Sequence, residues 1–131
     1  MRRSLILLAV MPLFACAQET EDAETAAATA APVGAPVSCI TLDQVISRRP
    51  AGAQAVEFEL TGGRRYRNEI VGACPGLERA GSADIVHVEA TGSQLCRDDR
   101  VRIYDPVEAR NTGAQSFPHC RLGMFTPIAA R

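Results

Sequence analysis

Four widely spaced cysteines limit what this chain can fold into more than any other feature of its sequence. The four are Cys39, Cys74, Cys96 and Cys120. No two of them form a C-x-x-C pair, so a zinc knuckle or a thioredoxin-like redox site fits poorly. In a small exported domain they predict two structural disulfides, and the three possible pairings stay open. We favour Cys74–Cys96, because Cys39–Cys120 would then tie the two ends of the domain together.

The N-terminus predicts export. Arg2 and Arg3 precede an apolar stretch from Leu5 to Phe14, and small residues follow it. A charged head, a short apolar core and a small-residue end are typical of a signal peptide. The core is about half of the ~20 residues that a membrane-spanning helix needs. We therefore assign residues 1–15 as a signal peptide, which places the mature chain in an oxidising compartment.

The cysteine that follows this signal is the predicted lipid attachment point. Leu13-Phe14-Ala15-Cys16 resembles the lipobox of bacterial lipoproteins, in which cleavage occurs before the cysteine and its thiol is lipidated. The resemblance implies a membrane anchor on Cys16, and the following Ala17 and Gln18 favour the outer membrane. Ala15-Cys16-Ala17 also fits an ordinary A-x-A site. Cleavage after Ala17 would instead give a soluble periplasmic protein, and either route leaves an even number of thiols.

Residues 16–37 differ in composition from the rest of the chain. They hold four acidic residues and no basic one, followed by an alanine-rich run that ends among prolines and a glycine. Nothing large is available there to bury, so we expect a flexible tether. Residues 38–131 form the predicted folded domain, in which arginines and carboxylates nearly balance and lysine is absent. This near-neutral charge and the few aromatic residues give no support for nucleic-acid binding.

The start of the domain matches a short helix. Residues 41–47 contain a capping-box pair, Thr41 and Gln44, and apolar residues at helical i, i+3, i+4 spacing. We expect one or two helical turns there, ending before Pro50.

The clearest strand signal is a hairpin. Residues 56–60 alternate apolar and acidic side chains, and residues 64–70 follow after Thr61-Gly62-Gly63. A two-residue Gly-Gly turn would mix the two faces, whereas a three-residue loop with a left-handed Gly63 keeps them apart. That loop pairs Phe58 with Tyr66, Glu59 with Arg65 and Glu57 with Arg67. We predict this register, with the aromatic pair buried and both charge pairs on the solvent-exposed face.

Further alternating runs predict the remaining strands. They cover Ile85–Glu89, Leu95–Cys96, Val101–Tyr104 and a last strand that alternates through Cys120, Leu122 and Met124 and ends before Pro127. Residues 107–117 have the composition of a loop. Five or six short strands separated by turns predict a mainly β fold. We expect a small antiparallel sheet that curls, or an open barrel, with one short N-terminal helix and two disulfides.

Cys74-Pro75-Gly76-Leu77 is the most specific of a series of motifs. The others are Cys39, Gly63–Arg67, Leu95–Val101 and Cys120–Gly123. Their order resembles a group of short proteobacterial envelope proteins that is catalogued only as a domain of unknown function, over roughly residues 38–126. The resemblance implies export and disulfide bonds and supplies no activity. The chain departs from the pattern at Asp98, where a glycine is expected, so the turn there is expected to differ.

Few residues suggest catalysis. Asp98 and Asp99, beside two arginines, form the densest charge cluster, but no further ligand stands nearby in sequence. A turn with an internal salt bridge is therefore expected. His87 and His119 are the other candidates for acid-base chemistry, and neither has a neighbouring nucleophile. Motifs for phosphate, zinc and calcium are absent from the sequence, so we predict no catalytic residue, no metal site and no cofactor.

The hairpin arginines are the best candidates for binding. Arg65 and Arg67 share one face, and guanidinium groups suit the carboxylates or phosphates of anionic envelope polymers, although Glu57 and Glu59 are expected to pair with them.

We expect a non-enzymatic envelope lipoprotein that acts as a binding or accessory module, with the membrane and an envelope protein or polymer as partners. The alternative is a small soluble periplasmic enzyme or enzyme inhibitor that uses the Asp98/Asp99 loop.

Overall fold

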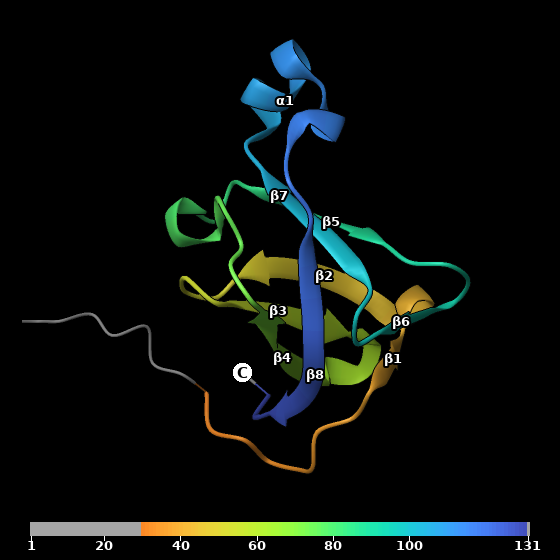
Figure 1. Cartoon of the computed structure of the whole chain (residues 1–131). Coiled ribbons are helices and arrows are strands. Elements are labelled where there is room, and N and C mark those ends of the chain that lie inside the picture. Colours follow the sequence, from red (N-terminus) through yellow and green to blue (C-terminus); the bar gives the residue numbers. More distant parts are fainter. Residues whose placement is uncertain (1–29, 131) are drawn as a thin grey trace, which may run out of the picture.

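A computed structural model describes residues 30–130, which are organised around one curled antiparallel sheet (Figure 1). Its strands are β2 (Val45–Pro50), β3 (Ala55–Leu60), β4 (Arg65–Val71), β5 (Ile85–Glu89), β7 (Arg100–Tyr104) and β8 (Cys120–Ile128). They follow the order β2-β3-β4-β8-β7-β5. The end strands β2 and β5 approach each other without a hydrogen-bonded ladder, so the barrel is nearly closed. The predicted mainly β fold is confirmed.

Smaller elements complete the described chain. A second, two-stranded sheet consists of β1 (Cys39–Thr41) and β6 (Gln94–Cys96), and one α-helix, α1, spans Pro106–Thr112. Single 3-10 turns are η1 (Leu42–Gln44), η2 (Thr61–Gly63), η3 (Leu77–Arg79) and η4 (Ala114–Ser116). Within residues 30–130, no helix has the length and apolar character needed to cross a membrane.

The barrel interior is filled by aliphatic side chains around two phenylalanines. Phe58 of β3 and Phe125 of β8 meet edge to face, with ring centroids 5.5 Å apart and planes inclined by 65°. The other large apolar side chains that are almost fully buried are Leu60, Leu77, Leu95, Leu122, Val56 and Val101. Nearly every element of the barrel contributes to this single core.

The predicted hairpin register is confirmed. β3 and β4 pair Phe58 with Tyr66, Glu59 with Arg65 and Glu57 with Arg67. The connecting turn places Gly62 at φ 80° and Gly63 at φ 78°, a backbone conformation that residues other than glycine rarely adopt. Alternation together with a loop of defined length was therefore sufficient to fix the pairing.

The predicted N-terminal helix is wrong. Only Leu42–Gln44 form a single 3-10 turn, Thr41 makes no side-chain cap, and the chain enters β2 at Val45. The β-branched pair at the start of β2 suits a strand, and pairing with β3 overrides the local helical pattern.

The short α-helix lies instead within the segment predicted as a loop. Asp105 caps α1 by accepting hydrogen bonds from the backbone N–H groups of Val107 and Glu108. Pro106 begins the helix, and Gly113 ends it at φ 83°. These are ordinary start and stop signals, so the sequence did contain this helix.

The two disulfides join Cys39 to Cys96 and Cys74 to Cys120. Two disulfides are confirmed, whereas the favoured bonds Cys74–Cys96 and Cys39–Cys120 are wrong. Pairing of β1 with β6 places Cys39 directly opposite Cys96. β4 lies beside β8, which brings the chain that leaves β4 close to Cys120. The neighbours of each strand are long-range information that cysteine spacing does not contain.

The last strand is longer than predicted and changes its inward face. β8 continues through Pro127 to Ile128, and its register on β4 shifts between Asn68 and Ile70. Beyond this bulge, Met124 is 38% exposed and Phe125 takes the inward position. The alternation predicted through Met124 therefore stops after Leu122, because the bulge interrupts it.

The chain ahead of Ser38 is attached to β8. Pro32 forms an isolated bridge with Ile128, and Val37 forms one with Phe125, in which the two residues exchange backbone hydrogen bonds of 2.8 and 2.9 Å. The end of the segment predicted as a tether thus lies along the barrel. The signal peptide, Cys16 and the tether up to residue 29 fall outside the described residues.

Candidate functional site

The hairpin arginines do not form the solvent-exposed face that the sequence predicted. Arg65 is 6% exposed and donates from Nη2 to Glu57 Oε2 at 2.5 Å and from Nη1 to the Ala129 carbonyl at 3.0 Å. Arg49 of β2 donates to the same Glu57 oxygen at 3.1 Å. Contacts with Glu57, with Arg49 of the neighbouring strand and with the residue after β8 surround the guanidinium group, so Arg65 is part of a largely buried ionic cluster.

The cluster sets the charge state of Glu57. Burial raises the pKa of Glu57, but hydrogen bonds and charge attraction from Arg49 and Arg65 outweigh burial and hold this pKa below its ordinary value of 4.5. Arg67 pairs with Glu69 of its own strand at 2.6 Å, and not with Glu57. Both hairpin guanidinium groups are thus already engaged by carboxylates.

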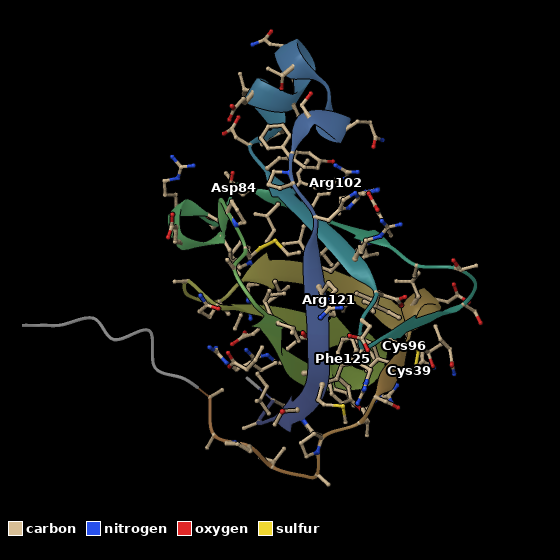
Figure 2. All side chains as sticks on the ribbon, viewed as in Figure 1. Cys39, Asp84, Cys96, Arg102, Arg121 and Phe125 are labelled. Atoms are coloured by element: carbon tan, nitrogen blue, oxygen red, sulfur yellow. A yellow bond between two sulfur atoms is a disulfide. The ribbon has the colours of Figure 1, made fainter. Side chains whose placement is uncertain are left out.

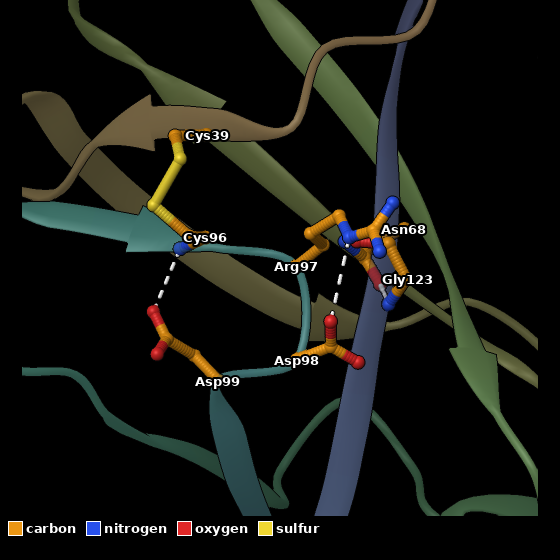
Figure 3. The surroundings of a disulfide bond; sticks show 7 residues. All are labelled: Cys39, Asn68, Cys96, Arg97, Asp98, Asp99 and Gly123. Carbon is orange, nitrogen blue, oxygen red and sulfur yellow. Dashed lines mark hydrogen bonds and ion pairs between the residues drawn. A yellow bond between two sulfur atoms is a disulfide. The ribbon is translucent and has the colours of Figure 1, made fainter.

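The Asp98/Asp99 loop is a local turn (Figure 3). Asp99 Oδ2 accepts a hydrogen bond from the Cys96 backbone N–H at 2.7 Å. Asp98 has φ 71°, the left-handed conformation that favours glycine, and its side chain pairs with exposed Arg97 at 3.3 Å. Over residues 30–130, no cluster of three or more histidine, cysteine or acidic side chains could hold a metal ion.

His119 takes part in a network around Arg102, which projects from β7 (Figure 2). Its Nδ1 lies 3.2 Å from Glu89 Oε2, and its Nε2 lies 2.8 Å from Arg102 Nη2. Arg102 also donates to Glu89 Oε1 at 2.6 Å and to the carbonyls of Gln115 and Phe117. The hydrogen bond from Arg102, followed by the charges around it, holds the pKa of Glu89 below its ordinary value. His87 is exposed on β5.

We expect neutral His119 to carry its proton on Nδ1, the less common tautomer. A guanidinium group can only donate, so Nε2 must accept from Arg102 while Nδ1–H donates to Glu89. Long-range ¹H–¹⁵N NMR should show an unprotonated Nε2 for His119, with exposed His87 as the reference. A protonated Nε2 in neutral His119 would contradict the network.

A cleft of about 640 Å³ lies between the loop that carries η3 and the segment of α1 and η4. Side chains from three separate parts of the chain line it; they include Arg79, Asp84, Tyr104, Asp105, Glu108 and Phe117. The rings of Tyr104 and Phe117 contact each other with centroids 5.4 Å apart. Figure 1 shows α1 and η4 projecting from the ends of β7 and β8, beyond the barrel.

The cleft presents charges of both signs that the described residues leave unpaired. Arg79 and Glu108 are exposed, and neither side chain has a hydrogen-bond or ion-pair partner within residues 30–130. Asp84 uses Oδ2 for the Gly81 N–H, and Asp105 uses Oδ1 for its helix cap. The cleft can therefore offer a guanidinium group and carboxylate oxygens to one ligand.

Covalent and ionic contacts hold the cleft walls in place. Cys74 immediately precedes the η3 wall, and its bond to Cys120 fixes that wall to β8. Arg102 holds the opposite wall through the carbonyls of Gln115 and Phe117. Sequence reasoning assigned no binding role to any lining residue, although Pro75 and Gly76 belong to its most specific motif, since the lining residues come together only in three dimensions.

The search for related proteins does not extend this description. Comparison with models of known protein families, with characterised proteins and with solved structures found no match.

Proposed function

We propose that this chain is an exported, lipid-anchored binding module of the bacterial envelope, and that its ligand occupies the cleft between η3 and α1. The observation that carries the proposal is the pair of unpartnered opposite charges, Arg79 on one wall and Glu108 on the other. Exposed charges usually contribute little to stability, so their placement around a walled cleft favours a binding role.

The envelope location is supported by the N-terminal pattern and by the disulfides. Cys16 stands at a lipobox-like site, and a lipid-anchored cysteine would attach the domain to the membrane. Two disulfides fit a chain that matures outside the cytoplasm. Mass spectrometry of the mature N-terminus tests this part: acyl chains on Cys16 are expected, and a free amine on Gln18 would contradict the anchor.

The charges suggest the kind of ligand. One guanidinium and several carboxylate oxygens suit a short peptide that carries both a carboxylate and an amine, such as the peptide stems of peptidoglycan. The Tyr104 and Phe117 rings offer an apolar surface to the sugar or aliphatic part of the ligand. This ligand is one form of the anionic envelope polymer expected from the sequence.

A non-catalytic role is supported by how the candidate catalytic groups are used. The Nε2 of His119, which an acid-base catalyst would aim at its substrate, is occupied by Arg102. Asp99 is engaged with the backbone of its own turn.

Arg79→Ala and Glu108→Ala should each weaken binding of soluble peptidoglycan fragments about three- to tenfold, as expected for partly exposed charged hydrogen bonds. NMR titration measures the affinity and locates the shift changes. Glu78→Ala and Arg110→Ala are matched controls, because both residues are exposed and lie within two positions of Arg79 or Glu108 in sequence but do not line the cleft. Shift changes confined to other surfaces, or equal affinity in all four variants, would refute the cleft as the site.

A further inference from the structure

The two disulfides differ in how easily a reagent can reach them. Cys74 is 6% exposed and Cys120 is 2% exposed, and both belong to the hydrophobic core. Cys39 and Cys96 are each partly exposed and lie outside that core (Figure 3). Attack on a disulfide requires a thiolate to contact one of its sulfur atoms. The Cys39–Cys96 bond therefore presents the accessible target.

The disulfides also differ in what they hold together. Cys74–Cys120 links the chain after β4 to the first residue of β8, within the six-stranded barrel. Cys39–Cys96 links β1 to β6, a sheet that makes no ladder with the barrel. Reduction of Cys39–Cys96 breaks no bond within the barrel, because the strand ladders and the Cys74–Cys120 disulfide do not involve these two cysteines.

The thiols released from Cys39 and Cys96 would stay close together. The two residues are direct partners in the β1–β6 register, with Cα atoms 4.0 Å apart. Ile40 and Leu95, the next pair, are 5% and 0% exposed and anchor both strands in the core. Backbone hydrogen bonds from Arg97 N–H to the Ser38 carbonyl and from Leu42 N–H to the Ser93 carbonyl flank the pair. The disulfide at such a site can therefore be reduced and re-formed while its two cysteines stay next to each other.

We propose that Cys39–Cys96 is a reversible thiol-exchange site, reduced by a dithiol partner while Cys74–Cys120 persists as the structural bond. A thiolate of the dithiol attacks one sulfur, forms a mixed disulfide and expels the other cysteine as a thiolate, which takes up a proton. The second thiol of the partner loses its proton, attacks the mixed disulfide and releases the remaining cysteine. Two electrons pass to the protein, and the dithiol becomes a disulfide.

The consequence of opening concerns the N-terminal side of the chain. Residues 30–38 lead directly into Cys39 and are attached to β8 through Pro32 and Val37. With the bond closed, Cys39 fixes the end of this segment to the 94–99 turn as well. Reduction removes the covalent part of that attachment and leaves the Arg97–Ser38 backbone hydrogen bond and the buried Ile40 in place, so the redox state regulates how firmly the N-terminal segment is held on the domain.

The test is stepwise reduction of the native mature protein with dithiothreitol, without denaturant. Free thiols are trapped with N-ethylmaleimide and assigned by peptide mass mapping, while circular dichroism follows folding. We expect Cys39 and Cys96 to be labelled at a dithiothreitol concentration at least about tenfold lower than Cys74 and Cys120, because of their greater accessibility. Oxidised glutathione should then restore the Cys39–Cys96 bond.

Simultaneous labelling of all four cysteines, or earlier labelling of Cys74 and Cys120, would overturn the proposal. A Cys39→Ser/Cys96→Ser variant gives an independent check. It should remain folded and should keep its other disulfide at dithiothreitol concentrations that open the first bond in the native protein. An unfolded double variant would show that Cys39–Cys96 is a structural bond, which also contradicts the proposal.

Discussion

Asn68→Ala is expected to lower the free energy of unfolding by about 2–5 kcal/mol, because it removes a fully buried side chain and leaves two part-buried backbone groups of Gly123 without that partner. Asn68 is 0% exposed. Its Nδ2 donates to the Gly123 carbonyl at 2.9 Å, and its Oδ1 accepts from the Gly123 N–H at 2.8 Å. These bonds lie at the register shift between β4 and β8, where the ladder is interrupted. The amide side chain thus takes the place of a missing backbone partner.

Urea unfolding of the native domain and the variant measures this loss. Asn111→Ala is the matched control, because Asn111 is exposed on α1 and its removal should change stability by less than about 0.5 kcal/mol. A similarly small change in Asn68→Ala would mean that water or a relaxed backbone satisfies Gly123 instead. The bulge would then not depend on this side chain.

The part of the fold that could be predicted is the part fixed by local pattern. Alternating residues, a loop of defined length and opposite charges gave the β3–β4 register residue by residue. The strands β5 and β7 follow from the same alternation. In each case, one buried face and one outer face specify the structure, since a slip by one residue would exchange them.

The sequence predictions were wrong where contacts between distant segments of the chain determine the structure. Residues 41–47 satisfy a helical spacing, but pairing of β2 with β3 uses residues 45–47 as a strand. Disulfide partners depend on which strands are neighbours. The inward face of β8 changes at Gly123, where a Cβ atom would lie 2.3 Å from the Glu69 carbonyl oxygen, so the bulge depends on a contact with β4. The cleft likewise joins three segments that no local pattern connects.

The outer face of the hairpin was misjudged for a related reason. Alternation correctly placed Glu57 and Arg65 on the side opposite Phe58, but it carries no information about what covers that side. Arg49 of β2 and Ala129 after β8 supply the cover, so this charged pair is buried.

Glu57→Ala is accordingly expected to destabilise the domain by about 3–5 kcal/mol, since removing one partner of a buried ion pair leaves an uncompensated charge. Among the residues that the structure describes, Arg65, which is 6% exposed, would keep the Ala129 carbonyl as its one partner. Its Nε already has no hydrogen-bond partner within the described residues. Thermal or urea unfolding measures the loss. Glu59→Ala is the control, because Glu59 follows on the same strand face and is only partly buried.

The same pair makes stability depend on pH. The pKa of Glu57 is lower in the folded domain than its ordinary value of 4.5, because Arg49 and Arg65 outweigh the effect of burial. Its ionisation therefore stabilises the fold above about pH 4.5, and this contribution is lost as the pH falls through the lower folded pKa. Glu57→Gln should lose less stability than the native domain between pH 6 and pH 3. Glu89, whose pKa is also lowered, keeps part of the slope in both proteins.

A double variant separates the cost of an unpaired charge from the value of the pair itself. Breaking a buried pair is expensive mainly because one charge stays buried, whereas replacing both partners by apolar residues of similar volume is often nearly neutral. Glu57→Leu/Arg65→Met should therefore be more stable than Glu57→Leu alone. Arg49 also loses its contact in both variants, but its side chain is 31% exposed and can turn to water. A double variant less stable than the single one would show that the ion pair itself, with its bond to Ala129, stabilises the barrel.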